Sequence, residues 1–196
     1  MWRYGRRFAG LVVLVIGWEL LVRPAAVSTL SAFQPQAGTA NAELTRLYTE
    51  DQADRQPPAG RQIDWVEVQK RDKARLARVR ELYTGGELRA GEDYWHAALV
   101  LQHGGEPTDY LLAHELCVVA IAKGYAGAKW LAAASEDRFL GSVGRSQRFG
   151  TQYNSSGPNA PFRLAPIEEG VTDALRREFD APTLAEAKAR EAEMNK

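Results

Sequence analysis

The sequence predicts an all-α protein. We expect a single helical-bundle domain of about five to six helices with a glycine-rich polar loop, preceded by an N-terminal signal or anchor helix. Successive segments have apolar residues at helical spacing and end at glycines. No segment sustains the apolar–polar alternation typical of strands over more than a few residues.

The first 28 residues predict export from the cell. Three arginines precede an apolar run at residues 8–18, which extends weakly to residue 22. This pattern is typical of a secretory signal, and the run is shorter than the roughly 20 apolar residues of a spanning helix. Residues 26–28 form an acceptable cleavage site. We expect a periplasmic or extracellular protein, or one that residues 8–22 tether to the membrane if the segment is not cleaved.

The charge and the cysteine content of the chain exclude some classes of function and structure. Residues 1–28 hold four of the 25 basic and one of the 25 acidic residues, so 21 and 24 remain, a net charge of −3. A mildly acidic chain lacks the basic surface that nucleic acid requires, so no nucleic-acid partner is expected. Cys117 is the only cysteine, which excludes an internal disulfide, and its apolar neighbours predict a buried side chain.

The rest of the chain divides into three parts. Residues 29–42 are small and polar and predict a flexible tether. Residues 43–165 hold the helical domain, and residues 166–196 a C-terminal helical extension that is polar enough to be solvated.

Five segments of the domain, the fifth of them rich in alanine, are helical in pattern before the polar loop. Residues 43–56 have leucines at helical spacing, and residues 64–84 form the clearest amphipathic helix, whose charged face we expect to be solvated. Residues 92–103 and 107–123 each end at glycine, and the second is apolar nearly all round, which is typical of a central helix.

An alanine-rich helix, residues 126–141, follows. Together with the helix before it, it is similar to the helix pairs of tetratricopeptide or Sel1-type repeats. No second copy follows at the repeat spacing, so this similarity is weak.

The three histidines are His96, His103 and His114. His96 and His103 lie seven residues apart, about 10 Å along a helix axis, which is too far for one ion to bridge easily. We therefore predict no metal site and no cofactor. His103 ends its helix beside two glycines, where it is either a general acid or base or an ordinary helix-ending residue.

The loop after residue 141 is rich in neutral hydrogen-bonding groups. Its glycine spacing is not that of a nucleotide-binding loop, and no strand precedes it. Side chains such as Gln147 and Gln152 can read a ligand or satisfy the backbone of the loop, and the sequence leaves both open.

Four short stretches resemble a bacterial family of domains of unknown function. They are EDQADR at residues 50–55, LQHG at 101–104, EDRFL at 136–140 and GRSQRFGTQ at 144–152, and together they span roughly residues 44–153. The resemblance implies that these stretches meet in space, around a site or in a buried network. The matching positions are Asp51, Gln52, Arg55, Gln102, His103, Asp137, Arg138, Gln147, Gly150, Thr151 and Gln152.

These residues define two functional hypotheses. In the first, an envelope protein binds or hydrolyses a small ligand: His103 is the acid or base and Asp137 or Asp51 orients it. In the second, the chain is a non-catalytic helical module that binds an envelope protein, and the sequence leaves open whether it is an enzyme. In the first hypothesis the ligand-binding residues are Asp51, Gln52, Arg55, Gln102, Arg138, Gln147, Thr151 and Gln152.

Overall fold

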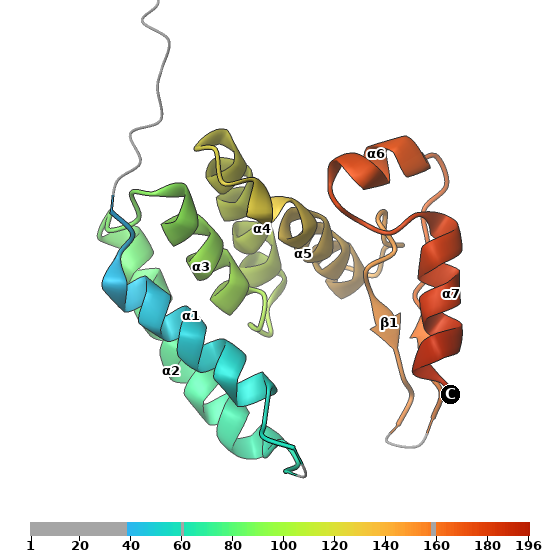
Figure 1. Ribbon diagram of the computed structural model, residues 1–196, viewed down its shortest axis with the longest axis horizontal. Coiled ribbons are helices and arrows are strands. Elements are labelled where there is room, and N and C mark those ends of the chain that lie inside the picture. Colours follow the sequence, from blue (N-terminus) through green and yellow to red (C-terminus); the bar gives the residue numbers. More distant parts are fainter. Residues whose placement is uncertain (1–38, 60, 158–159) are drawn as a thin grey trace, which may run out of the picture. The chain divides into compact units, whose positions relative to one another are not determined.

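The computed structural model describes residues 39–59, 61–157 and 160–196 (Figure 1). All described residues belong to one unit of the chain, which spans residues 35–196. The predicted signal or anchor at residues 1–28 and most of the predicted tether lie outside the described residues. Within the described part, no helix is both long enough and apolar enough to cross a membrane.

The described part of the chain is mostly helical, which confirms the predicted class. It contains seven α-helices, one short 3₁₀ helix and two strands of two residues each. The elements are α1 (Ala42–Arg55), α2 (Trp65–Thr84), α3 (Gly91–Leu101), α4 (Pro107–Ala122), η1 (Ala126–Ala128), α5 (Lys129–Ser142), β1 (Tyr153–Asn154), β2 (Arg163–Leu164), α6 (Asp173–Glu178) and α7 (Leu184–Met194).

Polar side chains at the helix starts explain several boundaries. The Asn41 side chain accepts hydrogen bonds from the first amides of α1, and Asp64 does the same for α2. Pro107 occupies the first turn of α4, where its missing N–H costs nothing. Thr183 and Glu186 cap α7 reciprocally, since each side chain bonds the backbone of the other residue.

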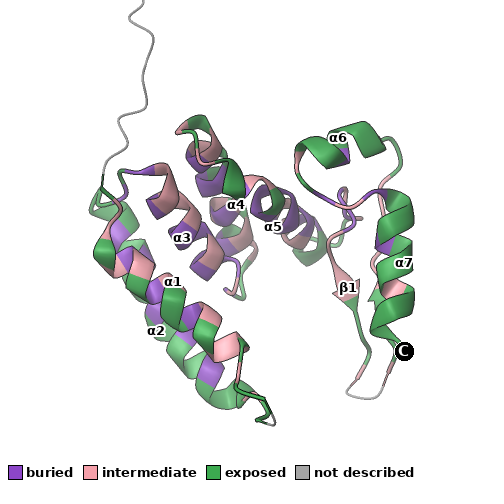
Figure 2. Ribbon diagram, viewed as in Figure 1, coloured by how far each residue is buried: buried purple, intermediate pink, exposed green. Residues whose placement is uncertain are grey.

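Helices α1 to α5 enclose the main apolar core. Its buried side chains come from all five helices, as the purple segments of Figure 2 indicate. Helix α4 packs against both α3 and α5, so it is central, as predicted. Its apolar residues are not all buried, as a central helix would predict, because Leu111 and Val118 are 39% and 49% exposed.

The C-terminal extension packs against the loop and hairpin instead of being only a solvated tail. Ala187 of α7 is fully buried, and its carbonyl accepts a 3.0 Å hydrogen bond from the Tyr153 hydroxyl of β1. Gly150 has φ +77°, and a Cβ there would lie 3.2 Å from the Cβ of Ala187. A glycine is therefore needed where the loop passes closest to α7. A second small core surrounds Phe149.

Candidate functional site

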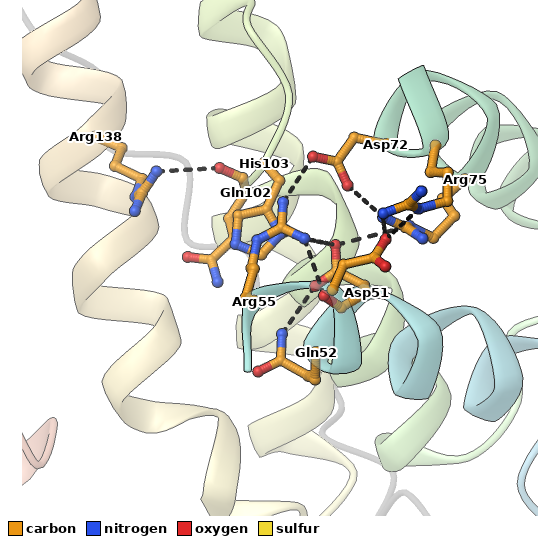
Figure 3. Close-up of polar contacts among 10 residues, drawn as sticks. Asp51, Gln52, Arg55, Asp72, Arg75, Gln102, His103 and Arg138 are labelled. Carbon is orange, nitrogen blue, oxygen red and sulfur yellow. Dashed lines mark hydrogen bonds and ion pairs between the residues drawn. The ribbon is translucent and has the colours of Figure 1, made fainter. Parts of the chain in front are cut away.

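Asp51 is the centre of a buried polar cluster (Figure 3). Its side chain is fully buried, and its Oδ1 lies 3.0 Å from His103 Nδ1 and 2.9 Å from Arg55 Nη1. Its Oδ2 accepts a 2.8 Å hydrogen bond from Gln52 Nε2. A carboxylate accepts but does not donate, so the proton of this contact is on Nδ1 of His103. In the neutral ring, Nε2 is then the basic nitrogen.

Two helix ends bring these groups together. Asp51 and Arg55 lie four residues apart on α1, so both side chains project from the same face of its last turn. His103 follows the last residue of α3 by two positions. Helix α1 packs along α3, and this packing sets the ring of His103 against Asp51. Residues in two of the four resembling stretches therefore meet directly.

A second layer of charges comes from α2. Asp72 joins two arginines, because its Oδ2 lies 2.7 Å from Arg55 Nη2 and its Oδ1 lies 2.7 Å from Arg75 Nη2. Arg75 also lies 2.7 Å from Asp54, which pairs with Arg71 at 2.8 Å. Three carboxylates, those of Asp51, Asp54 and Asp72, thus pair with three guanidinium groups, those of Arg55, Arg71 and Arg75.

The arginines lower the pKa values of two of these carboxyl groups. Burial alone raises the pKa of Asp72, but hydrogen bonds from Arg55 and Arg75 outweigh it and lower the pKa below its ordinary value. For Asp54 the hydrogen bond from Arg71 is the largest cause, and the pKa is again lowered. Both groups are therefore ionised near neutral pH.

The sequence did not identify Asp72 and Arg75 as members of this cluster. We expected the charged residues of α2 to be solvated, but Asp72 and Arg75 are only 8% and 5% exposed. The signal that was available is their position, because they lie between Val68 and Val79 on the apolar stripe of the helix. An opposite-charge pair inside an apolar stripe indicates a buried partner on another helix.

His103 also lines a cavity of about 450 Å³ between α2 and the α3–α4 loop. Its side chain is 15% exposed, so part of the ring is accessible while Asp51 is sealed behind it. Gly105 leaves its side of the loop open, since a Cβ there would meet nothing within 4 Å. The other lining residues are Gln69, Asp72, Lys73, Leu76, Arg80 and Gly104.

Asp137 belongs to a separate network in the polar loop. It is 1% exposed, and its oxygens accept hydrogen bonds from the backbone amides of Arg148 at 2.7 Å, Phe149 at 2.9 Å and Thr151 at 3.1 Å. The Thr151 hydroxyl adds a fourth bond of 2.8 Å. Of the two carboxylates predicted to orient His103, Asp51 is therefore the one that contacts it. Asp137 holds the loop.

The two glutamines of the loop also satisfy backbone groups. Gln147 is 2% exposed, and its Nε2 donates to the carbonyls of Gln152 at 3.0 Å and Ala165 at 2.9 Å. Its Oε1 accepts from the Gln152 amide at 2.8 Å. The Gln152 side chain donates to the Ala134 carbonyl at 3.4 Å and to Thr151 Oγ1 at 2.9 Å. These contacts support the structural alternative that the sequence left open for the loop.

Arg138 connects the two networks. Its Nη1 donates a 3.3 Å hydrogen bond to the backbone carbonyl of Gln102, at the end of α3 (Figure 3). Gln102 contributes this carbonyl from the position next to His103. All four resembling stretches are thus linked, but as two clusters joined by one contact and not as one site.

The remaining candidate groups lie elsewhere. His96 stacks on Tyr48 with ring centroids 4.4 Å apart, and His114 Nδ1 lies 2.9 Å from the Ala132 carbonyl oxygen. Among the described residues no group of three or more His, Cys, Asp and Glu is placed to hold a metal ion. Cys117 is fully buried, as predicted, and burial raises the pKa of its thiol to about 12.

Comparison of the chain with family models, with curated proteins and with solved structures finds no match. The resemblance to a bacterial family of domains of unknown function therefore stays a prediction.

Proposed function

We propose that this chain binds a small polar ligand in the cavity beside His103 and hydrolyses it, with the Asp51–His103 pair acting as a general base. One observation carries the proposal: His103 Nδ1 is held at 3.0 Å by a fully buried carboxylate while the same ring lines a cavity. Asp51 favours the tautomer in which Nε2 accepts a proton, which is the orienting role of a carboxylate beside a catalytic histidine.

Water is the proposed nucleophile. Among the residues that the structure describes, those lining this cavity include no serine, threonine or cysteine. His103 Nε2 takes a proton from water as the oxygen attacks the electrophilic carbon or phosphorus of the ligand. The bond to the leaving group then breaks, and Nε2 returns the proton to that group. Lys73, at the same cavity, supplies positive charge for the developing oxyanion.

The proposed setting is the cell envelope. The basic and apolar pattern of residues 1–28 supports export, and the net charge of the remaining chain argues against a nucleic-acid partner. The alternative, a protein-interaction module, draws on exposed apolar side chains such as Val118 and Trp130, which are 49% and 43% exposed. Neither of these residues lines the His103 cavity.

Hydrolysis by the full-length protein tests the proposal. Suitable probes are p-nitrophenyl acetate, p-nitrophenyl phosphate and an amino-acid p-nitroanilide, which separate ester, phosphate and amide chemistry. We expect one class to be hydrolysed, and His103→Gln to lower its kcat by about 10²- to 10⁴-fold. His114→Gln is the matched control, since His114 contacts a backbone carbonyl on α5. Unchanged rates in His103→Gln, or no turnover of any class by the folded wild type, would refute the proposal.

A further inference from the structure

A second cavity, of about 300 Å³, lies where α4, α5 and the polar loop meet. Tyr110 lines it from α4, Arg138 from α5, and Arg145, Gln152 and Asn154 from the segment that follows. None of its lining residues also lines the His103 cavity, so the two cavities are distinct. Its volume is at the lower end of the range of ligand pockets, which suits a small metabolite.

The charge of Arg138 has no counter-ion among the described residues. Burial is the largest influence on the pKa of its guanidinium and lowers it; Tyr110 acts in the opposite direction, and the positive charge of Arg55 lowers it further. Its Nε is buried without a hydrogen-bond partner, and the bond from Nη1 to Gln102 is a long one of 3.3 Å. A guanidinium has five N–H donors, so most of its capacity is unused by the protein.

The neighbouring Asp137 does not neutralise this arginine. Residues adjacent in a helix project in different directions, and the oxygens of Asp137 already accept four hydrogen bonds from Arg148, Phe149 and Thr151. The second arginine of the cavity, Arg145, is 3.6 Å from Glu168. Asp137 also lines the cavity, but none of the ion pairs among the described residues involves Arg138, so its guanidinium is left as a partly buried cation without an ion-pair partner.

We propose that this cavity binds a small organic acid, whose carboxylate pairs with the guanidinium of Arg138. A planar guanidinium matches the two oxygens of a carboxylate, and such charge-assisted pairs are among the stronger hydrogen bonds. One unpaired charge suits a carboxylate better than a phosphate dianion. Neutral groups on Tyr110 and Asn154 are available to the rest of the ligand. This site is independent of the acid–base role proposed for His103.

The test uses the full-length protein with sodium acetate, sodium phosphate and sodium chloride at matched ionic strength. We expect acetate to raise Tm and to shift the NMR signal of the Arg138 Nε–H, which burial protects from exchange. Arg138→Gln should weaken acetate binding by about tenfold or more. Arg46→Gln is the matched control, because Arg46 lies on α1 and pairs with Glu50 on the surface.

Each outcome decides the proposal. If Arg138→Gln binds acetate as the wild type does, or if chloride has the same effect as acetate, the site is refuted. Tighter binding of phosphate than of acetate would overturn the assignment to carboxylates. If Arg138→Gln does not fold, the Arg138 Nε–H signal of the wild type still decides: no shift with acetate contradicts the proposal.

Discussion

Asp51 and Asp137 are both buried carboxylates, with exposed fractions of 0% and 1%, but their partners differ in kind. Asp51 is held by side chains of His103, Arg55 and Gln52. Asp137 is held mainly by backbone amides of the loop that follows its own helix. A backbone amide does not gain or lose a proton near neutral pH, whereas the imidazole of a histidine can. Similar burial therefore serves a structural role at Asp137 and permits a chemical one at Asp51.

The largest expected effect is that of Asp137→Ala. The substitution leaves three backbone N–H groups of the loop without their acceptor, and we expect the free energy of unfolding to fall by about 3–5 kcal/mol. Chemical denaturation measures this loss. Glu136→Ala is the control on the adjacent residue, because it removes only the partly exposed ion pair with Arg148. Equal losses in the two variants would show that Asp137 does not hold the loop.

Asp51→Asn should cost less, about 2–3 kcal/mol, because Arg55 keeps its second partner Asp72. Its specific effect is on His103. An amide can donate as well as accept, so the tautomer of the ring is no longer determined by its partner. Nitrogen NMR of the His103 ring should report Nδ1–H in the wild type and a mixture of tautomers in the variant. An unchanged tautomer would remove the orienting role of Asp51.

The positions of the helices could be predicted from the sequence, but some of their packing contacts could not. Helix positions follow from apolar spacing and from caps such as Asp64 and Thr183, which act locally. The packing of α7 was not predictable in the same way. Its one buried residue is Ala187, a small contact that leaves little apolar pattern in a charged helix.

The site was predicted in part for a similar reason. Residue types indicated that His103 needs a carboxylate, but Asp51 and Asp137 have equivalent chemistry in the sequence. Only the packing of α1 against α3 selects Asp51. Asp72 and Arg75 were missed because charged residues are normally found at the surface. Only the tertiary structure shows that both are buried here.

At low pH, we expect the ion cluster around Asp51 to lose stability before the Asp137 network does. The folded-state pKa values of Asp54 and Asp72 lie below the ordinary 3.8, so near that pH the unfolded chain binds protons that the folded chain does not. The stability from these groups is complete above the unfolded pKa and is lost as the pH falls toward the folded values, by at most about 1.4 kcal/mol per pH unit for each carboxyl.

Amide hydrogen exchange at several pH values measures this loss locally. We expect exchange in α1 and α2 to accelerate more on acidification than the intrinsic rate explains. Asp72→Asn serves as the reference, since it has one of the two carboxylates removed and should show a shallower pH dependence. If the two proteins have the same dependence, the ion cluster is not the source of acid sensitivity.

The smallest effect is expected for the exposed pair of Arg46 and Glu50, which lies on the same helix as Asp51. The two groups are 2.7 Å apart, as close as the buried pairs, but their side chains are 55% and 47% exposed. Water screens such a pair, so Arg46→Gln should change the free energy of unfolding by no more than about 0.5 kcal/mol. A loss comparable to that of Asp51→Asn would mean that distance alone, and not burial with its unsatisfied partners, sets the strength of these contacts.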